Sequence, residues 1–108
     1  CITALVKSGL PSEKFQFHGF LPVKKKRKKL INTIANYENT TIIYESPHKI
    51  LKTLNELHIA CGERNIVVVK ELTKIYETAY RGNIQHVIND ISNSKLKGEF
   101  IILLDGKK

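Results

Sequence analysis

Apolar residues along the chain follow two spacings, one typical of strands and one typical of helices. The stretch 15–20 (FQFHGF) alternates apolar and polar residues, which predicts a short strand with one solvent-facing side. Residues 40–44 (TTIIY) are β-branched and aromatic and predict a second strand. The continuous apolar runs 66–69 and 100–104 are typical of strands buried on both faces. A more polar β-like stretch, 75–81, is expected nearer a sheet edge.

Helical spacing lies between these strands. One helix is predicted to follow the basic residues 24–29, with its apolar side beginning at Leu30. A second is predicted to start with Ser46 as N-cap and Pro47 at its first position, and to end at Gly62. A third is expected to be capped by Asn83. Its inward residues are Ile84, Val87, Ile88 and Ile91.

The order of these elements predicts the fold class. Residues 1–9 are interpreted as the end of a further helix closed by Gly9, so that helices and strands alternate along most of the chain. Alternation of this kind favours an α/β domain with a mixed sheet of about five strands, flanked by helices on both sides as three layers. The 108 residues suffice for one such domain.

Composition adds one strong feature to this picture, which is charge. The chain has 18 basic and 10 acidic residues and a net charge of +8. Six basic residues form the run 24–29; without them the count is 12 against 10, or +2. No apolar run reaches the length of a membrane span and no signal-peptide pattern opens the chain, so no membrane association is expected.

The basic run is a candidate phosphate-binding segment for RNA. A solvated helix start and attraction to acidic lipid are the competing interpretations. Positive charge at a helix N-terminus is unfavourable because the macrodipole is positive there, so helix stability does not explain the run. The candidate RNA-binding residues are Lys24, Lys25, Lys26, Arg27, Lys28 and Lys29.

Cysteine and histidine spacing argues against disulfide and metal chemistry. Cys1 and Cys61 lie sixty residues apart without a CxxC pattern, which favours a reduced, cytoplasmic chain. The four histidines show no metal-ligand spacing, and no metal site is predicted.

Two segments at predicted strand ends are candidates for ligand binding, because ligands of open α/β sheets sit beyond the carboxyl ends of strands. They are Tyr44-Glu45-Ser46 and residues 70–74 (KELTK). Simple helix initiation and a solvated turn are the plainer interpretations of the two segments. Glycine-rich nucleotide loops and a nucleophile elbow are absent from the sequence.

Several short motifs together resemble one known family. They are ITAL (2–5) with SGLPS (8–12), FHGFLP (17–22), IYESPH (43–48), KELTK (70–74) with Glu77-Thr78, and Gly98-Glu99. In this order and spacing they resemble the second half of the ribosomal RNA small subunit methyltransferase I family, within the tetrapyrrole (corrin/porphyrin) methylase superfamily.

The resemblance implies an S-adenosylmethionine-dependent enzyme that methylates the 2′-hydroxyl of a cytidine in small-subunit ribosomal RNA. Such enzymes have two α/β domains with the cofactor between them, and they form homodimers. Residues 1–108 resemble the C-terminal domain, and the chain starts at Cys1 without any Met, so we expect a piece of a longer protein. Alone it is expected to be inactive, because the other domain would supply half of the cleft.

The resemblance also implies which residues bind the cofactor. Carried over by position, these are Thr3, Ala4, Tyr44, Glu45, Glu71, Leu72 and Thr73. Glu45 and Glu71 are both candidates for the general base, and the sequence does not choose between them. Lys70 stands where arginine is common in relatives, which keeps the charge and loses the planar fork.

Two other functions remain open at this stage. One is a tetrapyrrole methylase, whose substrate is a small anionic macrocycle; the basic run favours RNA over it. The other is a non-catalytic RNA-binding module. In such a module Phe15, Phe17 and Phe20 would imitate the stacking residues of RNA-recognition sheets.

Overall fold

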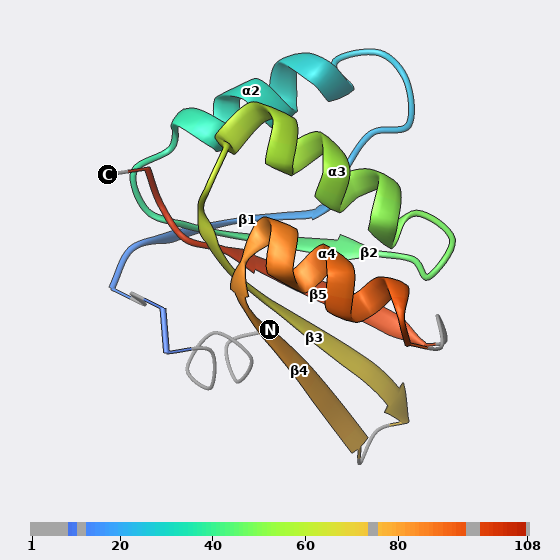
Figure 1. The fold of residues 1–108 in the computed structure, drawn as a ribbon. Helices are drawn as coiled ribbons and strands as arrows, with labels where there is room; N and C mark the ends of the chain where they lie inside the picture. The colour runs from blue at the N-terminus through green and yellow to red at the C-terminus, as the bar shows by residue number, and fades with distance from the viewer. Residues whose placement is uncertain (1–8, 11–12, 74–75, 95–97, 108) are drawn as a thin grey trace.

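The computed structural model describes residues 9–10, 13–73, 76–94 and 98–107 (Figure 1). The helix expected over residues 1–9 lies outside the described residues except for Gly9. Three helices and five strands are described, which agrees with the predicted α/β class. In chain order they are β1 (Phe15–Phe20), α2 (Arg27–Asn36), β2 (Thr40–Glu45), α3 (Ile50–Cys61), β3 (Asn65–Thr73), β4 (Tyr76–Asn83), α4 (Ile84–Ser92) and β5 (Glu99–Leu104).

The five strands form one mixed sheet in the order β1-β2-β5-β3-β4. β1 pairs parallel with β2, whereas β5 pairs antiparallel with both β2 and β3, and β4 pairs antiparallel with β3. The two strands predicted to be buried on both faces, β3 and β5, are interior, and the more polar β4 is at an edge, as expected.

All three described helices cover the same side of the sheet, which we call the helix face (Figure 1). The main core lies between these helices and the sheet and includes Ile43, Leu54, Val68, Ile91 and Ile102. The opposite side, the second face, holds a smaller buried cluster. Its members are Ile42, Val67, Val69 and Leu103. Helices were predicted on both sides of the sheet; in the described part of the chain all three lie on the helix face (Figure 1).

The helix ends were predicted with mixed success. The Asn83 side chain accepts a hydrogen bond from the His86 backbone N–H at 2.9 Å and caps α4, and Gly62, with φ of 70°, ends α3, as predicted. The predicted start of α3 at Ser46 and Pro47 is wrong, because α3 begins at Ile50. The Ser46 N–H donates to the Glu45 carboxylate at 2.9 Å, and the Ser46 carbonyl accepts from the Lys49 N–H at 3.1 Å. These bonds form a turn that precedes the helix.

Helix length also bears on membranes. Of the helices that the structure describes, none combines the length and the apolar character needed to cross a bilayer.

Candidate functional site

The two candidate segments lie at the same end of the sheet. Glu45 and Lys70 both pair with Phe100 of β5, from opposite sides of that strand, and Glu71 pairs with Glu99. β2 and β3 therefore point in the same direction, and their carboxyl ends are separated by the start of β5. Two strand spacings amount to about 10 Å. The segments were expected at neighbouring strand ends; they share one end, with a strand between them.

The structure describes some of the predicted cofactor-binding residues and not others. Leu72 and Thr73 continue β3 past Glu71, where the pairing with β4 shifts register. Thr3 and Ala4 lie outside the described residues, so their expected position near a domain join stays a prediction.

Tyr44 projects from the second face of the sheet. It is half-buried, and its ring contacts Phe17 and Phe20 of β1, with ring centroids 5.1 and 5.8 Å away. Across the sheet Tyr44 pairs with Ile101, which packs with the second-face cluster. The phenol ring therefore lies among aromatic and apolar side chains at the carboxyl end of the parallel β1–β2 pair. This is an environment suited to a flat, uncharged group such as a purine ring.

Glu45 points the other way, toward the helix face, and is 3% exposed. One carboxylate oxygen accepts the Ser46 N–H at 2.9 Å, and the other accepts the Thr53 hydroxyl of α3 at 2.6 Å. Successive strand residues face opposite sides of a sheet, so Tyr44 and Glu45 cannot line one ligand through both side chains. The Glu45 carboxylate joins β2 to α3, and only its main chain stands at the strand end.

A buried polar network extends from Glu45 to the basic run. Arg27, only 7% exposed, donates from Nη2 to the Thr53 hydroxyl at 2.9 Å and from Nη1 to the Pro22 carbonyl at 3.0 Å. Its Nε and Nη2 also reach the Glu56 carboxylate, the closest contact being 2.8 Å. The hydrogen bond to Glu56 raises the pKa of Arg27. Arg27 therefore connects α2, α3 and the preceding loop.

The burial of Arg27 corrects the expectation that it contacts RNA with its neighbours. Its guanidinium is engaged inside the protein, so the surface part of the run is five lysines. The signal that sequence reasoning missed is Thr53, a polar residue on the apolar side of α3. A buried hydroxyl needs partners, and these turn out to be Glu45 and Arg27.

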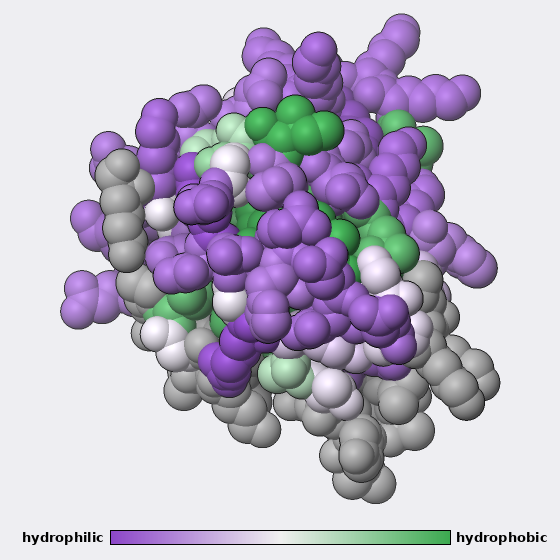
Figure 2. Space-filling view, in the orientation of Figure 1, coloured by the Kyte–Doolittle hydropathy of each residue, from purple (hydrophilic) through white to green (hydrophobic). Residues whose placement is uncertain are grey.

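The other five residues of the run are exposed; we call them the lysine surface. It comprises Lys24, Lys25, Lys26, Lys28 and Lys29. Long hydrophilic side chains project around α2 and the loop before it (Figure 2). Lys26, the N-cap of α2, adopts a left-handed φ of 67° without a side-chain cap, and the first turn of α2 has no acidic residue. The positive charge therefore does not stabilise the start of α2, which supports a role for these lysines other than helix stability.

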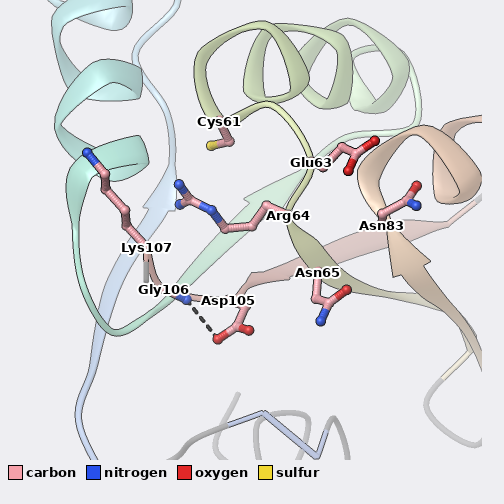
Figure 3. A pocket seen from close by; sticks show the side chains of 8 residues that line it. All are labelled: Cys61, Glu63, Arg64, Asn65, Asn83, Asp105, Gly106 and Lys107. Carbon is pink, nitrogen blue, oxygen red and sulfur yellow. Dashed lines mark hydrogen bonds between the residues drawn. The ribbon is translucent and has the colours of Figure 1, made fainter.

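A polar pocket of about 560 Å³ lies at the opposite end of the sheet from Tyr44 (Figure 3). Asn65 at the start of β3, Asn83 at the end of β4 and Asp105 just after β5 line it. Cys61 also lines this pocket, and burial raises the pKa of its thiol. The Asp105 carboxylate accepts the Gly106 N–H at 2.8 Å. The pocket lies at the amino end of β3 and the carboxyl ends of β4 and β5, away from the carboxyl ends of β1, β2 and β3, and none of the predicted site residues lines it.

In the part of the chain that the structure describes, no three His, Cys, Asp or Glu side chains are grouped so that they could hold a metal ion.

Comparison with curated proteins gives relatives over nearly the whole chain. A protein of Halalkalibacterium halodurans named ribosomal RNA small subunit methyltransferase I is 40% identical over 106 residues, which is 97% of this chain and 37% of that protein. A protein of the same name from Vibrio cholerae is 44% identical over 109 residues, 97% of this chain and 38% of that protein. The chain thus spans a little over a third of these relatives. No protein-family model matches it.

Solved structures share the fold at low sequence identity. Cobalt precorrin-4 methyltransferase, a cobalamin biosynthetic enzyme, has a TM-score of 0.67 and 18% identity, covering 96% of this chain and 46% of that one. Uroporphyrin-III C-methyltransferase from Thermus thermophilus, complexed with S-adenosyl homocysteine, has a TM-score of 0.56 and 14% identity, covering 93% and 48%.

The mixed five-stranded sheet with its helix layer is therefore the tetrapyrrole methylase fold. Within that fold class, the relatives that match 97% of the chain at about 40% identity are named ribosomal RNA small subunit methyltransferase I. The chain is similar to these proteins along part of their length.

Proposed function

We propose that residues 1–108 are the C-terminal domain of a methyltransferase that uses S-adenosylmethionine to methylate a cytidine 2′-hydroxyl of small-subunit ribosomal RNA. The observation that carries this proposal is the 40% identity, over 97% of the chain, to relatives named for ribosomal RNA methylation. The enzyme would act in the cytoplasm on the small ribosomal subunit and would be a homodimer at full length.

The chemistry of the strand ends fits one half of a cofactor site. Tyr44 offers a half-buried aromatic wall, and the main chains of Glu45, at the end of β2, and Glu71, near the end of β3, lie on either side of β5. The adenosine end of the cofactor needs such an apolar wall with a few backbone polar groups. When bound, the cofactor supplies an already activated methyl group on a sulfonium, so the protein contributes alignment and exclusion of water. We assign Tyr44, Glu45, Glu71, Leu72, Thr73, Thr3 and Ala4 to this half-site.

Of the two candidate general bases in this chain, Glu45 is the less suited. Both oxygens of the Glu45 carboxylate accept hydrogen bonds inside the protein, and the side chain faces the helix layer rather than the second face. A base must come within hydrogen-bond reach of the proton that it removes. We therefore give Glu45 a supporting role, and leave Glu71 or a residue of the other domain as the base.

The lysine surface is proposed to hold the RNA backbone. Five exposed ammonium groups on one loop and helix start suit a chain of phosphates better than one small macrocycle. This favours RNA over a tetrapyrrole as the substrate.

Methyl transfer to unmethylated small ribosomal subunits tests the proposal. The protein at the full length of its relatives should transfer labelled methyl groups to a cytidine 2′-oxygen, whereas residues 1–108 alone should transfer none. Tyr44→Ala should weaken cofactor binding by about 1–3 kcal/mol, and Tyr44→Phe, which keeps the ring, should change it little. Methylation of a base atom, or full activity of residues 1–108 alone, would contradict the proposal.

A further inference from the structure

Three aromatic rings gather on the second face at the carboxyl end of the parallel strands. Phe17 and Phe20 are 51% and 61% exposed, and both meet the Tyr44 ring edge-to-face, at interplanar angles of 76° and 72°. We call Phe17, Phe20 and Tyr44 the aromatic cluster. Single exposed apolar residues are ordinary, but three rings in mutual contact are a surface with a defined shape.

A bulge in β1 builds this cluster. Phe17 pairs with Ile42 and Gly19 with Ile43, so His18 is an extra residue in the strand. Residues three apart in a regular strand face opposite sides, and the insertion instead brings Phe17 and Phe20 to the same side. Gly19 has a φ of 62°, a backbone conformation that favours glycine. Bulges that re-aim side chains are typical of functional sites.

The surroundings of the cluster point to its ligand. Lys24, the first residue of the lysine surface, follows Phe20 by four residues, and so lies within about 14 Å of it along even a fully extended chain. Exposed aromatic rings beside a positively charged track are the combination by which proteins bind single-stranded nucleic acid. A second copy of this chain, with its own net charge of +8, has the wrong charge for this location.

We propose that the exposed rings of Phe17 and Phe20 are a stacking site for an unpaired nucleobase of RNA, within reach of Lys24 at the start of the lysine surface, while Tyr44, which both rings contact edge-to-face, belongs to the cofactor half-site. The inference rests on the proposed RNA substrate and adds base contacts made by Phe17 and Phe20. Flat rings stack on bases of any sequence, so the site selects single-stranded RNA rather than a particular nucleotide.

Binding of a short single-stranded oligoribonucleotide to the chain tests the site. The double variant Phe17→Leu with Phe20→Leu keeps apolar side chains and removes the rings. It should lower affinity by about tenfold or more, the scale of one stacked base. An abasic oligonucleotide of equal length should bind parent and variant alike. The matched control is Phe15→Leu, which changes a phenylalanine two residues before Phe17 on the same face, 38% exposed and paired with Thr40; its ring is not part of the three-ring contact.

A second arm uses the absence of tryptophan from the sequence. Phe20→Trp places an indole in the cluster, where stacking with a base should quench its fluorescence. Ile59→Trp on α3, at a position 85% exposed, should show no quenching. Equal loss of affinity on the abasic strand, or no quenching of the Phe20→Trp protein, would overturn the inference. So would a double variant that changes self-association in sedimentation without changing RNA affinity.

These measurements need neither cofactor nor methyl transfer. Base-dependent binding without ribosomal RNA methylation would therefore remove the proposed function and keep the stacking site. If a full-length protein methylates ribosomal RNA but its RNA affinity does not change when Phe17 and Phe20 are replaced, the proposed function stands and the stacking site is excluded.

Discussion

Arg27 differs from its five lysine neighbours in what its side chain contacts. Its guanidinium bonds to Thr53, Glu56 and the Pro22 carbonyl, whereas the lysines on either side are exposed. A fork with several donors can satisfy three partners at once, which an ammonium group cannot do with the same geometry. One residue of a basic run is thus devoted to holding the loop against α3.

Arg27→Ala should therefore destabilise the fold. It leaves the Thr53 hydroxyl and the Pro22 carbonyl with one partner fewer, and we expect the free energy of unfolding to fall by about 1–3 kcal/mol. Chemical denaturation measures the change. The matched control is Lys28→Ala on the exposed side of the same helix, which should stay within about 0.5 kcal/mol of the parent. Equal losses in both variants would show that the network adds nothing.

His18, the bulged residue of β1, should make stability depend on pH. Burial lowers the pKa of His18, and its Nε2 has no hydrogen-bond partner among the described residues. As pH falls, the His18 imidazole of the unfolded chain is therefore protonated before that of the folded chain. The free energy of unfolding decreases as pH falls below the ordinary histidine pKa of about 6.5.

Thermal unfolding at pH 7.5 and at pH 5.5 measures this dependence. The melting temperature should be lower at pH 5.5 than at pH 7.5, and His18→Asn should make this difference smaller. His48→Asn serves as the control, since His48 is exposed in the turn before α3. A His18→Asn protein with the parent's pH dependence would exclude His18 as the cause.

At the scale of elements, α4 is the helix whose start was predicted fully from local sequence. Asn83→Ala removes the side-chain oxygen that accepts the His86 N–H, and should lower the free energy of unfolding by about 1 kcal/mol. Asn89→Ala, at an exposed position within the same helix, is the control and should cost much less. Comparable losses from both substitutions would mean that the cap contributes nothing specific.

Sequence predicted caps and strands where neighbours along the chain decide them. Asn83 and Gly62 need only the residues beside them, and both act as expected. The Ser46-Pro47 start failed because Glu45, held by Thr53 eight residues later, takes the Ser46 N–H and favours a turn. The β1 bulge was missed for a similar reason, since the alternation of 15–20 shows apolar positions but not the register with β2.

At the scale of the whole molecule, the lysine surface should dominate the salt dependence of RNA binding. Each phosphate contact on a single strand contributes about −0.7 to the slope of log affinity against log salt. Replacing Lys24, Lys26 and Lys28 by Gln should therefore flatten the slope by about two units and weaken unrelated RNAs alike. The control is Lys52→Gln on α3, which should leave the slope unchanged. Equal slopes for parent and triple variant would make the run a solvated surface.

The sheet topology decides which strand ends lie next to each other, and the sequence does not show this topology. Tyr44 lies near the end of β2 as predicted, whereas Glu71, predicted to follow a strand that ends at 69, lies inside β3, which runs to Thr73. The insertion of β5 between the two strands depends on pairing between segments far apart in the sequence. The opposite directions of the Tyr44 and Glu45 side chains do follow from strand alternation alone. Family motifs group adjacent residues, whereas the sheet separates them onto two faces.

The central position of β5 has a consequence for synthesis. Residues 99–104 leave the ribosome after every other described strand, yet they alone join β2 to β3. Until then the β1–β2 pair and the β3–β4 hairpin share no strand pairing, and their exposed edges are open to wrong partners. A message truncated before codon 99 would therefore yield two unjoined pieces of sheet. The end of the sheet at which Tyr44 and Glu71 lie is therefore assembled only after residues 99–104 have been translated.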